Sequence, residues 1–246
     1  MLSALEFGSA EAATVLDTSP GWRRLGGSIV RDSKNHGKLD LTGIIQKSSN
    51  VGTSKLALSV PKEFFLDTYY NMGLMANTGT LLTGEISGLF HERNRWSEFE
   101  LATLSFGYGI SVTPAQLARM YAIIANGGTR INLNIIKDGQ TELVHEEEYR
   151  VVSAENAAAL IKMMESVTEP GGSGLKAAVD GYRIAGKTGT SRKAAPGGEI
   201  ELPGTSRVPG PLRATLILTA FMGLTLPLMP VQYLLLRMAP KGARRL

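Results

Sequence analysis

The chain has 246 residues, is 43% hydrophobic and 20% charged, and carries a net charge of +4 with a sequence pI of about 9.3. These values are ordinary for one globular domain with or without an appendage, and part of the basic excess lies in the last ten residues, so we expect no nucleic-acid partner. Because the chain has no cysteine and its three histidines show no metal-binding spacing, we exclude disulfides, thiolate zinc sites and cysteine nucleophiles, and we expect no metal or cofactor.

The first half of the chain is predicted to be mainly helical. The opening residues, MLSALEFGSAEAAT, have neither a basic region nor a long apolar core, so we expect no signal peptide. Residues 40–58 predict two short helices, with Asp40 as a cap and the polar stretch 47–50 in the break between them. Pro61 is predicted to open a further helix with an apolar side that includes Phe65 and Tyr69.

The segment 111–128 carries the clearest helix signal. Thr113 is a predicted N-cap, Pro114 suits the first helical position, and Gln116 completes a capping box. Leu117, Met120, Tyr121 and Ile124 recur at helical spacing and predict the buried face. The stretch Asn126-Gly127-Gly128 should end the helix.

The next segments predict a hairpin, a helix and a strand. Asp138-Gly139 is typical of the turn of a hairpin. A helix is expected from Ser153 to about Thr168, and it should bury Leu160, Met163, Met164 and Val167. The short apolar run 182–185 then predicts a strand that continues through Lys187.

The composition changes after Lys193. Residues 194–211 are rich in proline and glycine and predict a linker. Residues 214–236 form an uncharged run long enough to cross a bilayer, so we expect a membrane helix with a basic tail over 212–246. A buried core helix is the alternative. The charges that flank this run favour a cytoplasmic C-terminus and an outward-facing domain.

Two short motifs carry the predicted chemistry, Ser48-Ser49-Asn50 and Lys187-Thr188-Gly189-Thr190. Each alone is weakly specific: Ser48 and Asn50 are common helix caps, and Lys187 could be a solvated strand residue. In this order, about 140 residues apart, they match the second and third motifs of serine acyltransferases that react with penicillin.

The sequence around these motifs resembles the transpeptidase domain of class B penicillin-binding proteins. The resemblance runs over residues 1–193 and extends through the stretches FGYGISVTPAQLARMYAIIANGG and GGSGLKAAVDGYRIAGKTGTSRKA. The nearest group is the septal D,D-transpeptidase of cell division. The resemblance implies an α+β fold, serine β-lactamase-like, with helices packed on an antiparallel sheet. It also implies peptidoglycan cross-linking by acyl-serine transfer from D-Ala-D-Ala stem peptides, without a cofactor.

The same resemblance implies roles for six residues. Ser48 would relay a proton to the leaving nitrogen, and Asn50 would hydrogen-bond the substrate amide. Lys187 would place positive charge near the terminal carboxylate, and Thr188 and Thr190 would offer hydroxyls to it. Gly189 would leave room for the substrate backbone, and the Thr190 N–H would donate to the oxyanion. The two motifs should face each other across a cleft.

The family's nucleophile motif, Ser-x-x-Lys, is not found in the 47 residues before Ser48, and we expect it to lie just before Met1. Two other matches start at Ser59 and Ser173. We interpret Ser59 as a helix N-cap beside a proline, and Ser173 as part of a glycine-rich loop that cannot hold a serine and a lysine on one face. We therefore expect a partial transpeptidase domain that cannot form the acyl-enzyme.

Residues 211–246 resemble the N-terminal membrane segment of a lysophospholipid acyltransferase, without that family's catalytic motif. The alternative interpretation is a non-enzymatic, membrane-tethered fusion or fragment. The transpeptidase resemblance implies a stem peptide or β-lactam as ligand and divisome proteins as partners. It also implies a membrane-associated protein whose domain faces the periplasm or cell exterior.

Overall fold

The structure is a computed structural model that describes residues 1–80, 83–91, 93, 95–130, 133 and 149–189, together with four short pieces of strand after residue 192. Its contacts divide the chain into two compact units, Met1–Met163 and Met164–Leu246. The boundary falls inside helix α7 (Ala154–Glu165), which contributes to both units. The domain boundary expected near residue 194 stays a prediction.

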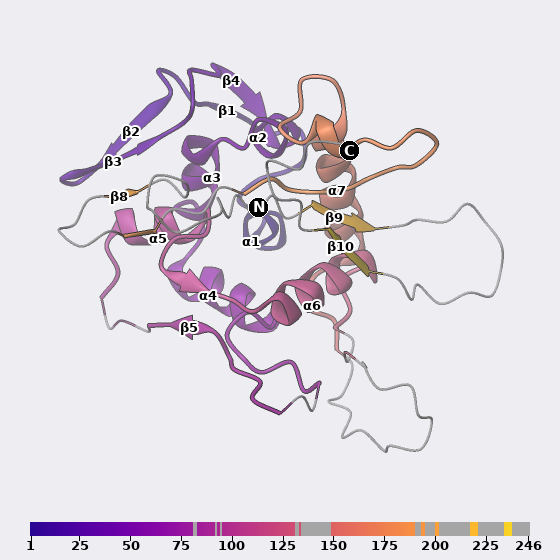
Figure 1. The fold of residues 1–246 in the computed structure, drawn as a ribbon. Helices are drawn as coiled ribbons and strands as arrows, with labels where there is room; N and C mark the ends of the chain where they lie inside the picture. The colour runs from indigo at the N-terminus through magenta and orange to yellow at the C-terminus, as the bar shows by residue number, and fades with distance from the viewer. Residues whose placement is uncertain are drawn as a thin grey trace. The chain divides into compact units, whose positions relative to one another are not determined.

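The first unit is mainly helical (Figure 1). Its helices are α1 (Leu2–Phe7), α2 (Leu41–Lys47), α3 (Asn50–Ala57), α4 (Lys62–Asn71), α5 (Glu98–Leu104), α6 (Pro114–Ala125) and most of α7. Its strands are β1 (Val15–Asp17), β2 (Trp22–Leu25), β3 (Ser28–Arg31), β4 (Lys38–Asp40), β5 (Leu89–Phe90) and β6 (Ile110–Ser111). The second unit contains the 3₁₀ turns η1 (Ser166–Thr168) and η2 (Leu175–Ala177) and the strands β7 (Lys193–Ala194), β8 (Ile200–Glu201), β9 (Ile217–Ala220) and β10 (Leu234–Arg237).

The strands of the described residues pair two by two, always antiparallel: β1 with β4, β2 with β3, β5 with β6, β7 with β8, and β9 with β10. The expected mixture of helices and antiparallel strands is confirmed, but these pairs do not join into one sheet. Residues 182–189 are not assigned to a strand, in contrast to the expectation, because a strand is defined by a pairing partner and no described segment pairs with them.

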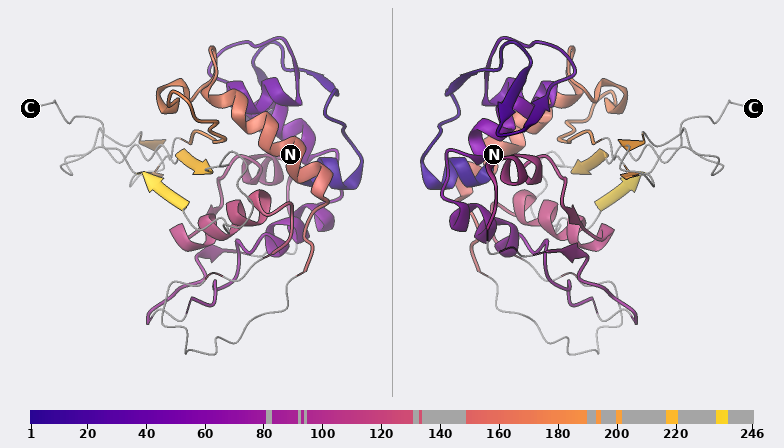
Figure 2. Two further views of the ribbon diagram at one scale, coloured as in Figure 1. Left: turned by 90° about the vertical axis from the view of Figure 1, so that its right-hand side faces the viewer. Right: turned by 90° about the vertical axis from the view of Figure 1, so that its left-hand side faces the viewer.

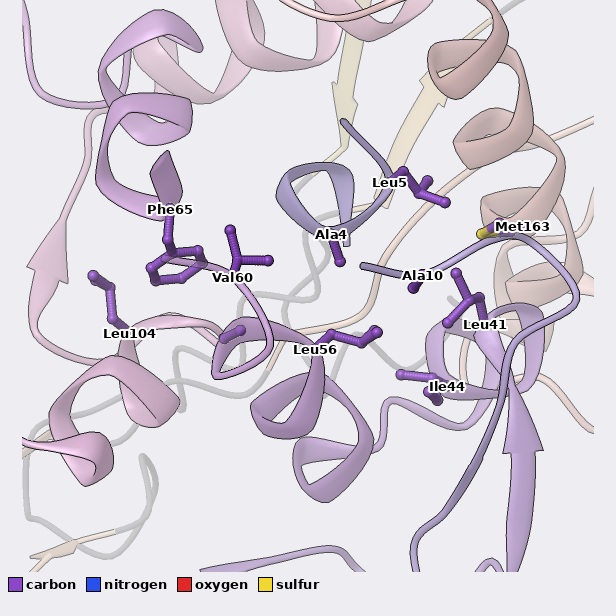
Figure 3. Close-up of a cluster of buried hydrophobic side chains, with 11 residues drawn as sticks. Ala4, Leu5, Ala10, Leu41, Ile44, Leu56, Val60, Phe65, Leu104 and Met163 are labelled. Atoms are coloured by element: carbon purple, nitrogen blue, oxygen red, sulfur yellow. The ribbon is translucent and has the colours of Figure 1, made fainter. Parts of the chain in front are cut away.

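The core of the first unit gathers apolar side chains from α1 to α5 and from α7 (Figure 3). Figures 1 and 2 show α1 beside α3 and α4, and these helices make direct contacts. The buried members of the core are Ala4, Leu5, Ala10, Leu41, Ile44, Leu56, Ala57, Val60, Phe65, Leu104 and Met163. Since α2 and α3 both insert apolar residues here, the turn between them is held from both sides.

The predicted caps of α2 and α6 are confirmed. The Asp40 carboxylate accepts a hydrogen bond from the Gly43 N–H at 2.7 Å, at the start of α2. Thr113 and Gln116 form a complete capping box at α6, with Pro114 in the first turn. Caps depend on residues three positions apart, which explains why sequence alone locates them.

The buried face of α6 differs in part from the prediction. Ile124 is buried as predicted, but Gln116 and Arg119 are almost completely buried as well, whereas Leu117, Met120 and Tyr121 are only partly buried. The Gln116 amide donates to the carbonyl oxygens of Ala76 and Ser87, and the Arg119 guanidinium donates to those of Gly73, Ala76 and Asn77. These bonds satisfy loop carbonyls and explain why two polar residues occupy the buried positions.

The helix predicted over 153–168 is present as α7 followed by η1, and Leu160, Met163, Met164 and Val167 are buried as expected. Of the predicted hairpin before it, the structure describes the two ends, where Thr129 and Arg150 form an antiparallel bridge. The predicted turn at Asp138-Gly139 lies outside the described residues.

The predicted C-terminal helix does not coincide with the described secondary structure. Within 212–246, the described residues form β9 and β10, which pair with Leu234 opposite Ala220. The rest of this segment, and most of the predicted linker 194–211, lie outside the described residues. Among the helices of the described residues, none combines the length and the apolar character needed to cross a bilayer.

Candidate functional site

The Ser48-Ser49-Asn50 motif occupies the turn between α2 and α3. Ser48 ends α2 in the left-handed conformation (φ 57°, ψ 47°), and its N–H bonds the carbonyls of Ile44 and Ile45. Asn50 is the first residue of α3, and its side-chain amide donates to the Arg31 carbonyl at 3.0 Å. Ser48 and Asn50 are both half-buried. The helix cap is Ser49, so the interpretation of Ser48 or Asn50 as the cap of α3 is wrong.

Ser49 and Asp32 lock this turn to the end of β3. The Ser49 hydroxyl, 1% exposed, donates to one Asp32 carboxylate oxygen at 2.6 Å and accepts from the Gly52 N–H at 2.9 Å. The other Asp32 oxygen accepts from the Val51 N–H at 2.9 Å. Asp32 therefore caps α3 from outside the helix and fixes the backbone that carries the two predicted site residues. No local pattern around Asp32 indicates this role, because its partners lie 17 or more positions later in the chain.

Tight packing of α2 against α3 also restricts the motif. A Cβ placed on Gly52 would lie 2.7 Å from the Ile44 Cγ1 atom, so only glycine fits there without a shift. Both helices are anchored by core residues, including Ile44 and Leu56 (Figure 3). The turn is consequently rigid on both sides.

Lys187 and Thr188 follow a buried segment of the second unit. Ile184 and Ala185 are buried, the Gly186 N–H bonds the Met164 carbonyl at 3.1 Å, and the Thr168 hydroxyl donates to the Ile184 carbonyl at 3.0 Å. These contacts attach the segment to the end of α7 and to η1. Burial lowers the pKa of the Lys187 ammonium from 10.5 to about 8, because the charged form loses hydration.

The Lys187 and Thr188 side chains are held by specific contacts. The Lys187 ammonium donates to the Thr188 carbonyl at 2.9 Å. The Thr188 hydroxyl donates to the Ser173 hydroxyl at 2.9 Å. A half-buried ammonium that follows a buried segment is chemically suited to a carboxylate, and the two hydroxyls of Thr188 and Ser173 add neutral polar groups in the same unit.

Gly189 is exposed, and a Cβ placed on it would meet no atom within 4 Å. Its φ also lies outside the range that disfavours other residues. Neither internal packing nor backbone conformation therefore demands glycine at this position. Thr190 lies outside the described residues.

The structure divides the predicted residues between its two units. Ser48 and Asn50 belong to the first, and Lys187, Thr188 and Gly189 belong to the second. The expectation that the two motifs face each other stays a prediction. No group of three or more His, Asp or Glu side chains in the described part of the chain could hold a metal ion.

Neither Ser-x-x-Lys match is arranged as a nucleophile and base. The Ser59 hydroxyl donates to the Leu56 carbonyl at 2.9 Å and lies 2.9 Å from the Ser9 hydroxyl, while the Lys62 ammonium pairs with Glu63 at 3.1 Å. The predicted N-cap role of Ser59 is wrong, because Pro61 occupies that position of α4 and has no side-chain cap. The Ser173 hydroxyl accepts a hydrogen bond from the Thr188 hydroxyl.

Comparisons with known proteins agree with the motifs. The sequence profile of the penicillin-binding protein transpeptidase domain matches residues 1–208. The peptidoglycan D,D-transpeptidase FtsI of Escherichia coli strain K12 is 46% identical over 198 residues, which cover 80% of this chain and 33% of that protein. The probable peptidoglycan D,D-transpeptidase PenA of Neisseria flavescens is 39% identical over 191 residues, which cover 77% and 46% of the two chains.

Solved structures show the same likeness. The apo transpeptidase domain of Burkholderia pseudomallei penicillin-binding protein 3 matches with a TM-score of 0.74 and 34% identity, over 81% of this chain and 59% of that chain. The chain spans between a third and a half of the length of the two curated relatives. The resemblance of residues 211–246 to an acyltransferase segment stays a prediction.

Proposed function

Because the chain belongs to the penicillin-binding protein transpeptidase family, we propose that it acts in peptidoglycan cross-linking at the division septum and that its described residues bind the donor stem peptide. The single observation that carries this proposal is the half-buried Lys187 ammonium, next in the chain to Thr188, whose hydroxyl is hydrogen-bonded to that of Ser173. A D-Ala-D-Ala peptide ends in a carboxylate, and a β-lactam presents a carboxylate in the corresponding place. Lys187 offers the positive charge that such a group requires, and the hydroxyl pair adds neutral polar groups.

Six residues carry the proposed chemistry. Ser48 and Asn50 serve proton transfer and substrate positioning, and Lys187 supplies charge, so these three are the catalytic residues. Thr188, Gly189 and Thr190 bind the substrate. Gly189 fits this role because its open surroundings leave room for a peptide backbone. The rigid turn that Asp32 holds fits the requirement that Ser48 keep a constant position.

The described residues support binding without acyl transfer. Transfer requires a serine whose oxygen attacks the penultimate D-Ala carbonyl while a base removes its proton. Ser59 donates its proton to a backbone carbonyl, and the lysine three residues later pairs with a carboxylate. We therefore propose that the 246-residue polypeptide, taken by itself, binds the ligand reversibly and forms no acyl-serine.

The substrate determines where the protein would work. Peptidoglycan lies outside the cytoplasm, so the domain would face the periplasm or cell exterior in association with the membrane. Divisome proteins are the proposed partners at the septum.

Reversible binding is tested with diacetyl-Lys-D-Ala-D-Ala and its C-terminal amide, by chemical-shift titration of the 246-residue protein. We expect the acid to bind at least tenfold more tightly than the amide, and Lys187→Gln to abolish the difference. Lys176→Gln, which removes an exposed charge 11 residues earlier, is the matched control and should keep it. Equal binding of acid and amide by the unaltered protein would contradict the proposal and favour a non-enzymatic role.

Acyl transfer is tested separately with a fluorescent penicillin. After denaturation, the protein should carry no covalent label. A label that disappears in Ser59→Ala or in Ser173→Ala would identify a nucleophile and refute the proposal of reversible binding alone.

A further inference from the structure

The Ser173 hydroxyl occupies a defined place next to Thr188. Thr188 is the donor of their 2.9 Å hydrogen bond, and Ser173 is the acceptor. A serine hydroxyl has one proton to donate and two lone pairs that accept. The Ser173 proton is therefore not used in this bond, and the exposed Ser173 side chain can present it to a ligand.

Glycines on both sides of Ser173 fix its loop against η1. The Gly174 N–H donates to the Val167 carbonyl at 2.9 Å, and the Gly172 N–H donates to the Glu169 carbonyl at 2.9 Å. A Cβ on Gly172 would lie 2.2 Å from the Val167 carbonyl oxygen, so no larger residue fits. The loop is held by its own backbone, and Ser173 is the side chain that it projects toward Thr188.

Gly174 connects the loop to Thr188 as well. A Cβ on Gly174 would lie 2.9 Å from the Val167 Cγ1 atom and 3.4 Å from the Thr188 Cγ2 atom. The Thr188 methyl group thus lies against the buried Gly174 while its hydroxyl bonds Ser173. Both substituents of the Thr188 Cβ atom are fixed by the same loop, which sets the direction of the hydroxyl.

The number of available protons decides which hydroxyl meets a carboxylate. The Thr188 proton is used toward Ser173, so a carboxylate that approaches this pair would meet the lone pairs of Thr188 or the O–H of Ser173. We propose that Ser173 is a further ligand-binding residue. It accepts a hydrogen bond from the Thr188 hydroxyl and donates one to the terminal carboxylate of the ligand. This inference rests on the proposed function, because it adds a donor to the same carboxylate site.

The Ser-x-x-Lys pattern at 173–176 is not arranged as a nucleophile and its base. η2 begins at Leu175, two residues after Ser173, so Ser173 and Lys176 do not lie on one helical turn. The hydrogen bond at Ser173 comes from a neighbouring hydroxyl, which is the donor and does not act as a base toward the Ser173 proton. Its position suits hydrogen bonding and not nucleophilic attack.

The test is a titration of the 246-residue protein with diacetyl-Lys-D-Ala-D-Ala and with its C-terminal amide. Ser173→Ala should weaken binding of the acid about tenfold and leave the amide nearly unchanged, because one hydrogen bond to a charged group is lost. Ser173→Thr keeps the hydroxyl and should bind the acid within about threefold of the original protein. Ser59→Ala, the matched control at the other Ser-x-x-Lys serine, should change neither ligand's affinity.

The outcomes separate this inference from the proposed function. If Ser173→Ala binds the acid as tightly as the unaltered protein does, while Lys187→Gln loses the preference for the acid, only the role of Ser173 is refuted. An equal loss for acid and amide would mean that Ser173 merely supports the loop, which also refutes it. If the unaltered protein does not distinguish acid from amide, the carboxylate site itself is refuted.

Discussion

The Asp32 carboxylate at the end of β3 accepts hydrogen bonds from the buried Ser49 hydroxyl at 2.6 Å and from the Val51 N–H at 2.9 Å. These two bonds hold the turn that carries Ser48 and Asn50. The residue between the two predicted site residues is thus structural, and its partner lies 17 positions earlier in the chain. A catalytic turn that is anchored in this way keeps its geometry without help from a ligand.

Removal of the Asp32 carboxylate should destabilise the first unit. Asp32→Ala leaves a buried hydroxyl and a helix N–H without their acceptor, so we expect the free energy of unfolding to fall by about 2 kcal/mol. Asp67→Ala removes an exposed carboxylate of α4 and serves as the control, with an expected change below about 0.5 kcal/mol. Urea unfolding measures both. Equal midpoints for the two variants would show that Asp32 does not anchor the turn.

A second carboxylate ties the N-terminal helix to the start of α7. One Glu6 oxygen accepts from the Ser153 N–H at 2.9 Å, from the Ser153 hydroxyl at 2.8 Å and from the Asn156 amide at 2.7 Å. Glu6→Ala should lower the free energy of unfolding by about 1–2 kcal/mol, and Glu6→Gln by less, because glutamine keeps the oxygen but loses the charge. Thermal unfolding of both variants beside the exposed-residue control Glu11→Ala is the measurement. A larger loss for glutamine than for alanine would contradict this account.

The lowered pKa of Lys187 predicts how ligand binding depends on pH. The ammonium is charged below about pH 8, and a bound carboxylate favours the charged form. Affinity for diacetyl-Lys-D-Ala-D-Ala should therefore be constant below about pH 7 and fall as the pH rises through 8, while affinity for the amide stays flat. Titrations from pH 6 to 10 measure this. A decline that begins only near pH 10.5 would show that Lys187 is not buried enough to be perturbed.

The lowered pKa of Lys187 also predicts how the stability of the folded protein depends on pH. Stability should rise with pH, whereas affinity for the ligand should fall. Because the pKa of Lys187 is lower in the folded protein than in the unfolded chain, the unfolded chain binds more protons between about pH 8 and pH 10.5. The contribution of Lys187 to stability should rise with pH across this window. The free energy of unfolding of Lys187→Met, subtracted from that of the original protein at each pH, isolates this contribution. A difference that falls across the window would contradict the lowered pKa of Lys187.

Gly174 and Gly189 form a matched pair of glycines near Thr188. A Cβ on Gly174 would lie 2.9 Å from the Val167 side chain, whereas a Cβ on Gly189 meets nothing within 4 Å. Gly174→Ala should lower stability by about 1–3 kcal/mol through overpacking. Gly189→Ala should leave stability within about 0.5 kcal/mol and still weaken peptide binding, if the substrate backbone passes there. Retained binding in Gly189→Ala would refute that path.

Local patterns in the sequence predicted much of the first unit. Asp40, Thr113 and Gln116 were assigned as caps, and the buried face of α7 was predicted, because these features depend on residues three or four positions apart. The resemblance to transpeptidases followed from motifs of three or four residues and was confirmed by the family profile. The strand through Lys187 was not confirmed, since pairing requires a partner strand and the described residues provide none for it.

Sequence by itself determined the class of this protein, the starts of α2 and α6 and the identity of its chemical groups, because each of these is written in short, contiguous patterns. Tertiary structure alone decided three hydrogen bonds: from Ser49 to Asp32, from the buried Arg119 to loop carbonyls, and from Thr188 to Ser173. The physical reason is that a hydrogen bond acts over about 3 Å between atoms, whatever their separation along the chain. Only the folded chain brings Ser173 and Thr188, 15 positions apart, within that distance.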